Sequence, residues 1–203
     1  MKLIAAIIAL HAGIATAAAA APRNSDPDWP CQQVKVTELS VAAFWSGPAV
    51  DPATSGWQQN EAVAALVAAV TQRRLPMEAA TQRIGAFAKD SGEDRERAMP
   101  LVFAGVFDVL NREREKVISG LDRFGERQKT LAAGLRQDSE ALRAAQAANP
   151  PDDAKVAELT QHLLWDQQLF DSRRQSLSFA CDLPTIIEQR LYGLAQAIQA
   201  HID

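Results

Sequence analysis

Apolar side chains recur every three or four positions along most of the chain after residue 37, and charged side chains occupy the faces between them. This spacing is typical of amphipathic α-helices. The one brief alternation of apolar and polar residues is QVKVTELSV at residues 33–41, which we interpret as an extended arm that leads into a short helix. The pattern predicts an all-α fold.

Two stretches are apolar on nearly all sides and predict core helices. One covers residues 62–70 and follows a Ser-x-x-Gln spacing at Ser55 and Gln58, which predicts a capping box. Its nine residues are too few to cross a membrane. The other is LVFAGVFDVL at residues 101–110. Between them, Pro76 is expected in the first turn of a further helix, where its missing N–H is harmless.

A long helical stretch is expected to begin at Ser91, whose spacing to Asp94 predicts a second capping box. Pro100 should kink or restart this helix, because proline lacks the N–H that a helix interior uses. Further along, Glu126 and Lys129 have the spacing of an ion pair on one helix face.

Beyond the core the apolar residues change to a seven-residue repeat, by which two helices pack along a seam. Two consecutive prolines, Pro150 and Pro151, interrupt the repeat, and Gln128 and Asp138 are polar exceptions within it. The apolar seam residues are Leu110, Val117, Leu121, Phe124, Leu131, Leu135, Leu142, Val156, Leu163, Phe170 and Leu177. We therefore predict a long antiparallel helical hairpin with its tip at the two prolines.

The two arms of this hairpin also complement each other in charge. Residues 111–148 hold eight basic and six acidic side chains, whereas residues 152–182 hold three basic and six acidic. Folding back places Cys181 near the level of Gly120, and Pro184 should turn or kink the chain. The expected organisation is one domain over residues 22–203, with a helical bundle core (about 37–118 and 184–203) and a protruding hairpin (about 119–182).

The N-terminus predicts export. Lys2 precedes an apolar stretch at residues 3–10, and the alanine-rich run that follows offers small-x-small cleavage sites. This layout is typical of a secretory signal peptide, which we place at residues 1–21. We therefore expect a periplasmic protein without a membrane span. Lipid attachment at Cys31 is not expected, because Trp29 and Pro30 precede it where small residues are needed.

Export changes the interpretation of the two cysteines, because disulfides persist in oxidising compartments. Cys31 and Cys181 are the whole thiol inventory, and no Cys-x-x-Cys spacing occurs. The prediction is a Cys31–Cys181 disulfide that ties the N-terminal arm to the body, and the alternative is two buried free thiols. The formal net charge of −4 gives no reason to expect a nucleic acid partner.

Few residues suggest chemistry. His162 lies four residues before Asp166, and in the expected hairpin register Asp138 approaches from the other arm, so the three could hold a divalent metal ion. The alternative is an ordinary solvated helix flank. His201 lies near the C-terminal end, and the carboxylates in Arg-rich runs are expected to form self-paired helix faces. No catalytic constellation and no cofactor are predicted.

Three of the four tryptophans, Trp29, Trp45 and Trp57, lie in the N-terminal part of the chain, and Trp165 lies apart from them. Trp45 and Trp57 are expected to anchor the N-terminal arm onto the core, and the alternative is a groove for a peptide or glycan. Trp165 lies beside Leu164 near the hairpin tip. It either packs across the arms near Gln137 or is exposed with Leu164 as a protein-contact surface.

These observations favour an exported, non-enzymatic protein that acts as a protein-interaction, adaptor or chaperone-like module through its hairpin. The expected partner is another envelope protein, and a homodimer is open because a heptad seam can be satisfied within one chain or by a second copy. The alternative is a periplasmic protein that binds a small ligand or a divalent metal. An enzyme that works through carboxylates alone has no positive support in the sequence.

Overall fold

The computed structural model describes residues 26–202, so the predicted signal peptide lies outside the described residues. Within them the α-helices are α1 (Glu61–Val70), α2 (Met77–Asp90), α3 (Arg95–Ala147) and α4 (Asp153–Gln199), with short 3-10 turns η1 (Val41–Ala43), η2 (Trp57–Gln59) and η3 (Gly92–Asp94). No strand is present in this part of the chain, and the predicted all-α fold is confirmed. None of the helices in these residues has the length and apolar character needed to cross a membrane.

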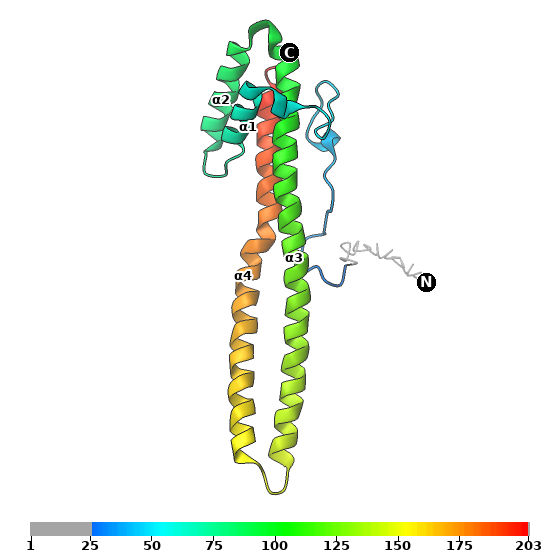
Figure 1. The fold of residues 1–203 in the computed structure, drawn as a ribbon, viewed down its shortest axis with the longest axis vertical. Helices are drawn as coiled ribbons and strands as arrows, with labels where there is room; N and C mark the ends of the chain where they lie inside the picture. The colour runs from blue at the N-terminus through cyan, green and yellow to red at the C-terminus, as the bar shows by residue number, and fades with distance from the viewer. Residues whose placement is uncertain (1–25, 203) are drawn as a thin grey trace, which may run out of the picture.

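The long helices α3 and α4 lie side by side and run antiparallel, as predicted (Figure 1). The 53 residues of α3 correspond to about 80 Å at 1.5 Å per residue. The chain reverses at the two prolines between them, and the side chain of Asp152 then accepts a hydrogen bond of 3.0 Å from the backbone N–H of Lys155. This cap satisfies one of the orphan donors in the first turn of α4.

The hydrophobic core lies at the end of the hairpin where α1 and α2 pack beside α3 and α4 (Figure 1). Trp45 and Trp57 are both buried there, which confirms them as anchors. The ring of Trp45 stacks on Phe103 with centroids 4.2 Å apart. The indole N–H of Trp57 donates to a carboxylate oxygen of Asp108 at 3.1 Å. The segment between the arm and α1 is therefore held by aromatic packing.

Both predicted capping boxes are wrong. Helix α1 begins at Glu61, and the side chain of Asn60 caps it by accepting a hydrogen bond of 3.1 Å from the backbone N–H of Val63. Ser55 lies outside the helix because the buried Trp57 occupies the separate turn η2. The hydroxyl of Ser91 donates back to the carbonyl of Phe87 at 2.8 Å instead of capping the next helix. At Ser55 the capping pattern gives way to the burial of Trp57, and at Ser91 it gives way to another hydrogen bond of the same hydroxyl.

The two prolines in the long helices do not end them. Pro100 lies inside α3 in its second turn, so the carbonyl that its missing N–H leaves unpaired, that of Glu96, belongs to the first turn. Pro184 lies inside α4, which continues without a turn to Gln199. Both prolines are buried, and packing along the neighbouring helix keeps each helix continuous. Figure 1 shows α4 shift its course in the orange part without a break in the helix.

Burial decreases along the hairpin towards its tip. Gly125 is the last buried residue of α3, and Cys181 is the first buried residue of α4. Beyond these two, in the described chain, seam residues such as Leu131, Leu163 and Phe170 are only half-buried. Among the described residues, no other helix covers the distal hairpin, and the outer faces of its two helices are open.

Candidate functional site

The N-terminal arm is fastened to the middle of the hairpin. Cys31 and Cys181 form a disulfide with their Cα atoms 5.6 Å apart, as predicted. A small apolar cluster surrounds the bond and is made of Trp29, Ile118 and Leu121 together with the two cysteines. Cys181 therefore lies at the level of residues 118–121 of α3, close to the predicted level of Gly120.

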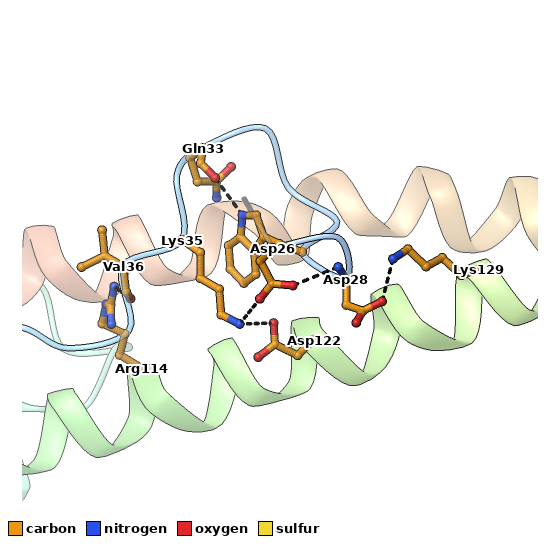
Figure 2. Close-up of polar contacts among 9 residues, drawn as sticks. Asp26, Asp28, Gln33, Lys35, Val36, Arg114, Asp122 and Lys129 are labelled. Atoms are coloured by element: carbon orange, nitrogen blue, oxygen red, sulfur yellow. Dashed lines mark hydrogen bonds and ion pairs between the residues drawn. The ribbon is translucent and has the colours of Figure 1, made fainter. Parts of the chain in front are cut away.

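Charged contacts hold the arm on both sides of the disulfide (Figure 2). The Lys35 ammonium lies 2.6 Å from the carboxylate of Asp26 and 2.8 Å from that of Asp122 on α3. It also lies over the ring of Trp29, 5.7 Å from the centroid. Lys129 on α3 reaches Asp28 at 2.7 Å, and not Glu126, its expected partner on the helix. The ammonium of Lys129 therefore pairs with the N-terminal arm and not with the residue of its own helix that the sequence spacing predicted.

These contacts shift two pKa values. The hydrogen bond from Lys35, followed by that from the backbone N–H of Asp28, lowers the pKa of Asp26 below its usual value of 3.8. The hydrogen bond to Asp122, followed by that to Asp26, raises the pKa of Lys35 above 10.5. Each shift favours the charged form, because each group faces an opposite charge in the folded protein.

Arg114 holds the next part of the arm from inside α3. Its side chain is only 2% exposed, and it donates to a carboxylate oxygen of Glu188 on α4 at 2.5 Å and to the backbone carbonyl of Val36 at 2.6 Å. A second, longer hydrogen bond of 3.5 Å reaches the carbonyl of Thr37. Arg114 therefore joins α3, α4 and the arm at one point, where Figure 2 shows it beneath the arm.

The N-terminal arm leaves one side of α4 open, and this side carries large apolar side chains. Trp165 is 68% exposed and Leu164 is 61% exposed. Of the two alternatives for Trp165, packing across the arms near Gln137 is therefore wrong. Phe179, at 76% exposure, and Ile186, at 47%, are exposed further along the same helix. Whether Trp165 and Leu164 contact a protein partner stays a prediction.

Trp165, Phe179 and Ile186 belong to one row, because positions 165, 172, 179 and 186 are seven apart. Phe179 and Ile186 were not expected as candidate contact residues, although a seven-residue spacing outside the main seam was the available signal. We call this row, with its neighbours, the outer face of α4. The side chains on this face between Trp165 and Phe179 carry no charge and are Gln168, Leu169, Ser172, Gln175 and Ser176.

The outer face of α4 continues into the core end of the molecule, where α2 covers it. The next position of the row is Gly193, and a Cβ atom there would lie 2.9 Å from the terminal methyl of Met77, the first residue of α2. Four residues of the row precede Gly193 without such a cover. Near the tip, Trp165, Gln168, Leu169 and Ser172 line a shallow hollow.

The structure brings together the three predicted metal ligands. Nδ1 of His162 lies 3.3 Å from a carboxylate oxygen of Asp138 on α3 and 3.9 Å from one of Asp166 on α4. One ligand atom from each residue lies within 4.8 Å of the other two. The expected approach of Asp138 from the opposite arm is therefore confirmed as geometry, and ion binding stays a prediction.

Comparison of the chain with protein families, with curated proteins and with solved structures found no match. Two features of the described residues bear on function, the outer face of α4 and the cluster at His162.

Proposed function

We propose that this protein is an exported, non-enzymatic interaction module, adaptor or chaperone-like, which binds an apolar helix of an envelope protein partner along the outer face of α4. The observation that carries the proposal is the exposed row Trp165, Phe179 and Ile186 on a face without charged residues between the two aromatics. The support comes from the composition of this face, its continuation to the place where α2 packs, the charge of residues 152–182 and the expected compartment.

Two features of the outer face of α4, its exposed aromatic residues and the absence of charge between them, are typical of an interface centre. Aromatic residues are enriched and charged residues are depleted at the centres of protein interfaces, and Trp is among the residues that contribute most to binding. Single exposed apolar residues are ordinary on protein surfaces, whereas a row of them along one helix marks a contact surface. Trp165 and Phe179 would anchor the partner, and Leu164 would lie at the rim.

The position of α2 argues that the occupant is a helix. Helix α2 already packs on this face at Gly193, where the absence of a side chain admits the end of Met77. A helix that places apolar side chains every three or four residues can continue the same packing from Ile186 towards Trp165. The partner helix would then become the third element that the distal hairpin lacks.

Charge and compartment add two further features of the partner. The outer face lies on the second helix of the hairpin, and residues 152–182 of this helix have three basic and six acidic side chains. Basic residues flanking the apolar stripe of the partner would therefore be favoured. The predicted signal peptide and the disulfide between Cys31 and Cys181 favour an oxidising compartment such as the periplasm.

A site-specific photocrosslinking experiment tests the proposal. A photoreactive residue replaces Ser172, between the two aromatics of the row, and in a matched control it replaces Tyr192, which is 54% exposed on α4 outside the row. The full chain is expressed in the cells from which it comes, the cells are irradiated, and the segments captured in the adducts are sequenced. We expect position 172 to capture a segment with apolar residues at helical spacing, and position 192 not to capture it.

Variants decide whether the row itself binds. Trp165→Ala and Phe179→Ala should each remove the adduct formed at position 172, while Tyr192→Ala should leave it unchanged. Equal adducts from both positions, or an adduct that survives both aromatic substitutions, would contradict the proposal. Capture of a second copy of the same chain would replace the envelope partner by a homodimer.

A further inference from the structure

We propose that Asp138, His162 and Asp166 form a binding site for one zinc-like divalent transition-metal ion, which clips the two arms of the distal hairpin together. The ligands come from both helices: Asp138 lies on α3, and His162 and Asp166 lie one turn apart on α4. The site does not depend on the proposed partner.

The spacing of the ligand atoms matches that of a small tetrahedral ion. Zinc binds imidazole nitrogen and carboxylate oxygen at about 2.0–2.2 Å, which places neighbouring ligand atoms about 3.4 Å apart. Nδ1 of His162 lies 3.3 Å and 3.9 Å from the carboxylate oxygens of Asp138 and Asp166. A third distance, between the two carboxylates, is within 4.8 Å, so a small rotation of either side chain completes the arrangement.

The two aspartates occupy places that packing alone would give to apolar residues. Asp138 is seven residues after the seam residue Leu131, and Asp166 is seven residues after the half-buried Leu159. Their side chains are only 27% and 19% exposed. Two carboxylates facing each other in a seam repel, and partial burial strengthens the repulsion. A bound cation turns the same pair into an attractive contact between the arms.

Within residues 26–202, no lysine or arginine supplies this charge. In the described residues the only ion-pair partner of Asp138 or of Asp166 is the imidazole of His162. Elsewhere on the hairpin and the N-terminal arm, several carboxylates meet Lys or Arg, as Asp122 meets Lys35 and Asp28 meets Lys129. The cluster at His162 differs because its two carboxylates face an imidazole, which can bind a metal ion, and not the permanent charge of a lysine or an arginine.

The chemistry of the donors selects the ion. One imidazole nitrogen with two carboxylate oxygens suits zinc and its neighbours, whereas calcium requires six to eight oxygen ligands and copper(I) prefers sulfur. Three protein ligands leave a fourth position for water or for a group of a binding partner. Because the ligands meet only when the arms are paired, metal binding and pairing of the distal hairpin stabilise each other.

Calorimetric titration of the full mature chain with ZnCl2 tests the site. The protein carries no affinity tag and is first stripped of metal with EDTA. We expect one zinc ion per chain, and at least tenfold weaker binding in His162→Ala and in Asp138→Asn. The first matched control is His201→Ala, which removes the other histidine of the described residues. The second is Asp171→Asn on α4, since the carboxylate of Asp171 lies 3.7 Å from Arg174 and outside the cluster. Both controls should bind zinc as the parent does.

Hydrogen exchange of residues 126–180 distinguishes a metal clip from a simple ion pair. With zinc, exchange in both arms should slow in the parent protein and stay unchanged in Asp138→Asn. Without metal, Asp138→Asn should be protected at least as well as the parent, because the substitution removes a like charge. Two results would overturn the proposal: no stoichiometric zinc in the parent, or equal zinc affinity in the parent, His162→Ala and Asp138→Asn. Circular dichroism confirms that each variant keeps its helices.

Discussion

The backbone carbonyl oxygen of Asp28 lies directly against Gly125 in the middle of α3. A Cβ atom at position 125 would come within 1.9 Å of this oxygen and 3.3 Å of Pro30. Glycine in a helix interior is unfavourable by about 1 kcal/mol relative to alanine, so its presence needs a reason. The reason is the arm, whose path crosses the helix where no side chain stands in its way.

Substitution of this glycine should loosen the arm. Gly125→Ala would force the backbone at Asp28 away from α3 and should cost about 1–3 kcal/mol of unfolding free energy, despite the higher helix propensity of alanine. Urea unfolding measures the cost, and hydrogen exchange of residues 26–36 shows whether the arm has moved.

Gly134→Ala is the matched control for this prediction. Gly134 also lies within α3, but a Cβ atom there would meet nothing within 4 Å. This substitution should stabilise the protein by about 0.5–1 kcal/mol through helix propensity alone. A stabilising Gly125→Ala would show that the arm does not hold its position against α3.

Removal of the disulfide should destabilise the whole fold. The bond between Cys31 and Cys181 closes a loop with a sequence separation of 150 residues, for which the chain-entropy relation gives about 5 kcal/mol. Urea unfolding of the Cys31→Ser/Cys181→Ser protein should reveal a loss of up to this size. Reductant should lower the stability of the parent and leave the double variant unchanged, and a parent insensitive to reductant would refute the prediction.

Arg114 should be among the least replaceable polar residues. Arg114→Ala leaves the carbonyl of Val36 and the carboxylate of Glu188 without their donor, and should cost about 3 kcal/mol. Arg114→Lys keeps the charge but lacks the planar fork that reaches both partners, so its stability should lie between that of the parent and that of Arg114→Ala. Thermal unfolding orders the three proteins, and equal stability of the Ala and Lys variants would show that the charge contributes nothing.

The attachment of the arm should weaken in acid. Because the pKa of Asp26 is lowered on folding, its contribution to stability is complete above its ordinary value of 3.8 and is lost as the pH falls through the lowered value. The stability difference between the parent and Asp26→Asn should therefore be constant near neutral pH and disappear in strong acid. Unfolding curves of both proteins, measured at intervals of about one pH unit from about pH 2 to about pH 7, check this prediction. A difference that persists in strong acid would exclude the contact with Lys35 as its cause.

The aromatic row should contribute little to the fold itself. Trp165→Ala and Phe179→Ala replace side chains that are mostly exposed, and each should change the unfolding free energy by no more than about 0.5 kcal/mol. Trp57→Ala, in the buried core, should cost about 3–5 kcal/mol. If the exposed aromatics proved as costly as Trp57, their place in the sequence would be explained by stability and not by binding.

The parts of the fold that follow from periodic patterns were predictable. The seven-residue rows and the two prolines at the tip fix the register of the hairpin, and the register places Cys181 opposite Ile118 and brings Asp138 to His162. These are local signals with a long reach, because a helix carries its spacing rigidly over many turns.

The parts that depend on packing between unlike elements were not predictable. The contact of Gly125 with Asp28 joins a helix to an extended arm, and neither has a shared period that would announce it. The start of α1 moved to Glu61 because burial of Trp57 outweighs the capping pattern at Ser55. The row Trp165, Phe179 and Ile186 has a seven-residue spacing that the sequence shows, but the spacing alone does not say which row of α4 the rest of the fold leaves exposed.

The place of the disulfide has a consequence for a cut chain. Residues 148–152, the turn between α3 and α4, are all exposed, and an exposed loop tip is a preferred place for proteolytic cleavage. This turn lies between Cys31 and Cys181 along the sequence, so a single cleavage there yields two fragments that the sulfur–sulfur bond still joins. The nicked molecule would keep its mass until it met a reductant, and its two arms would be free to separate at the tip while the base stayed closed.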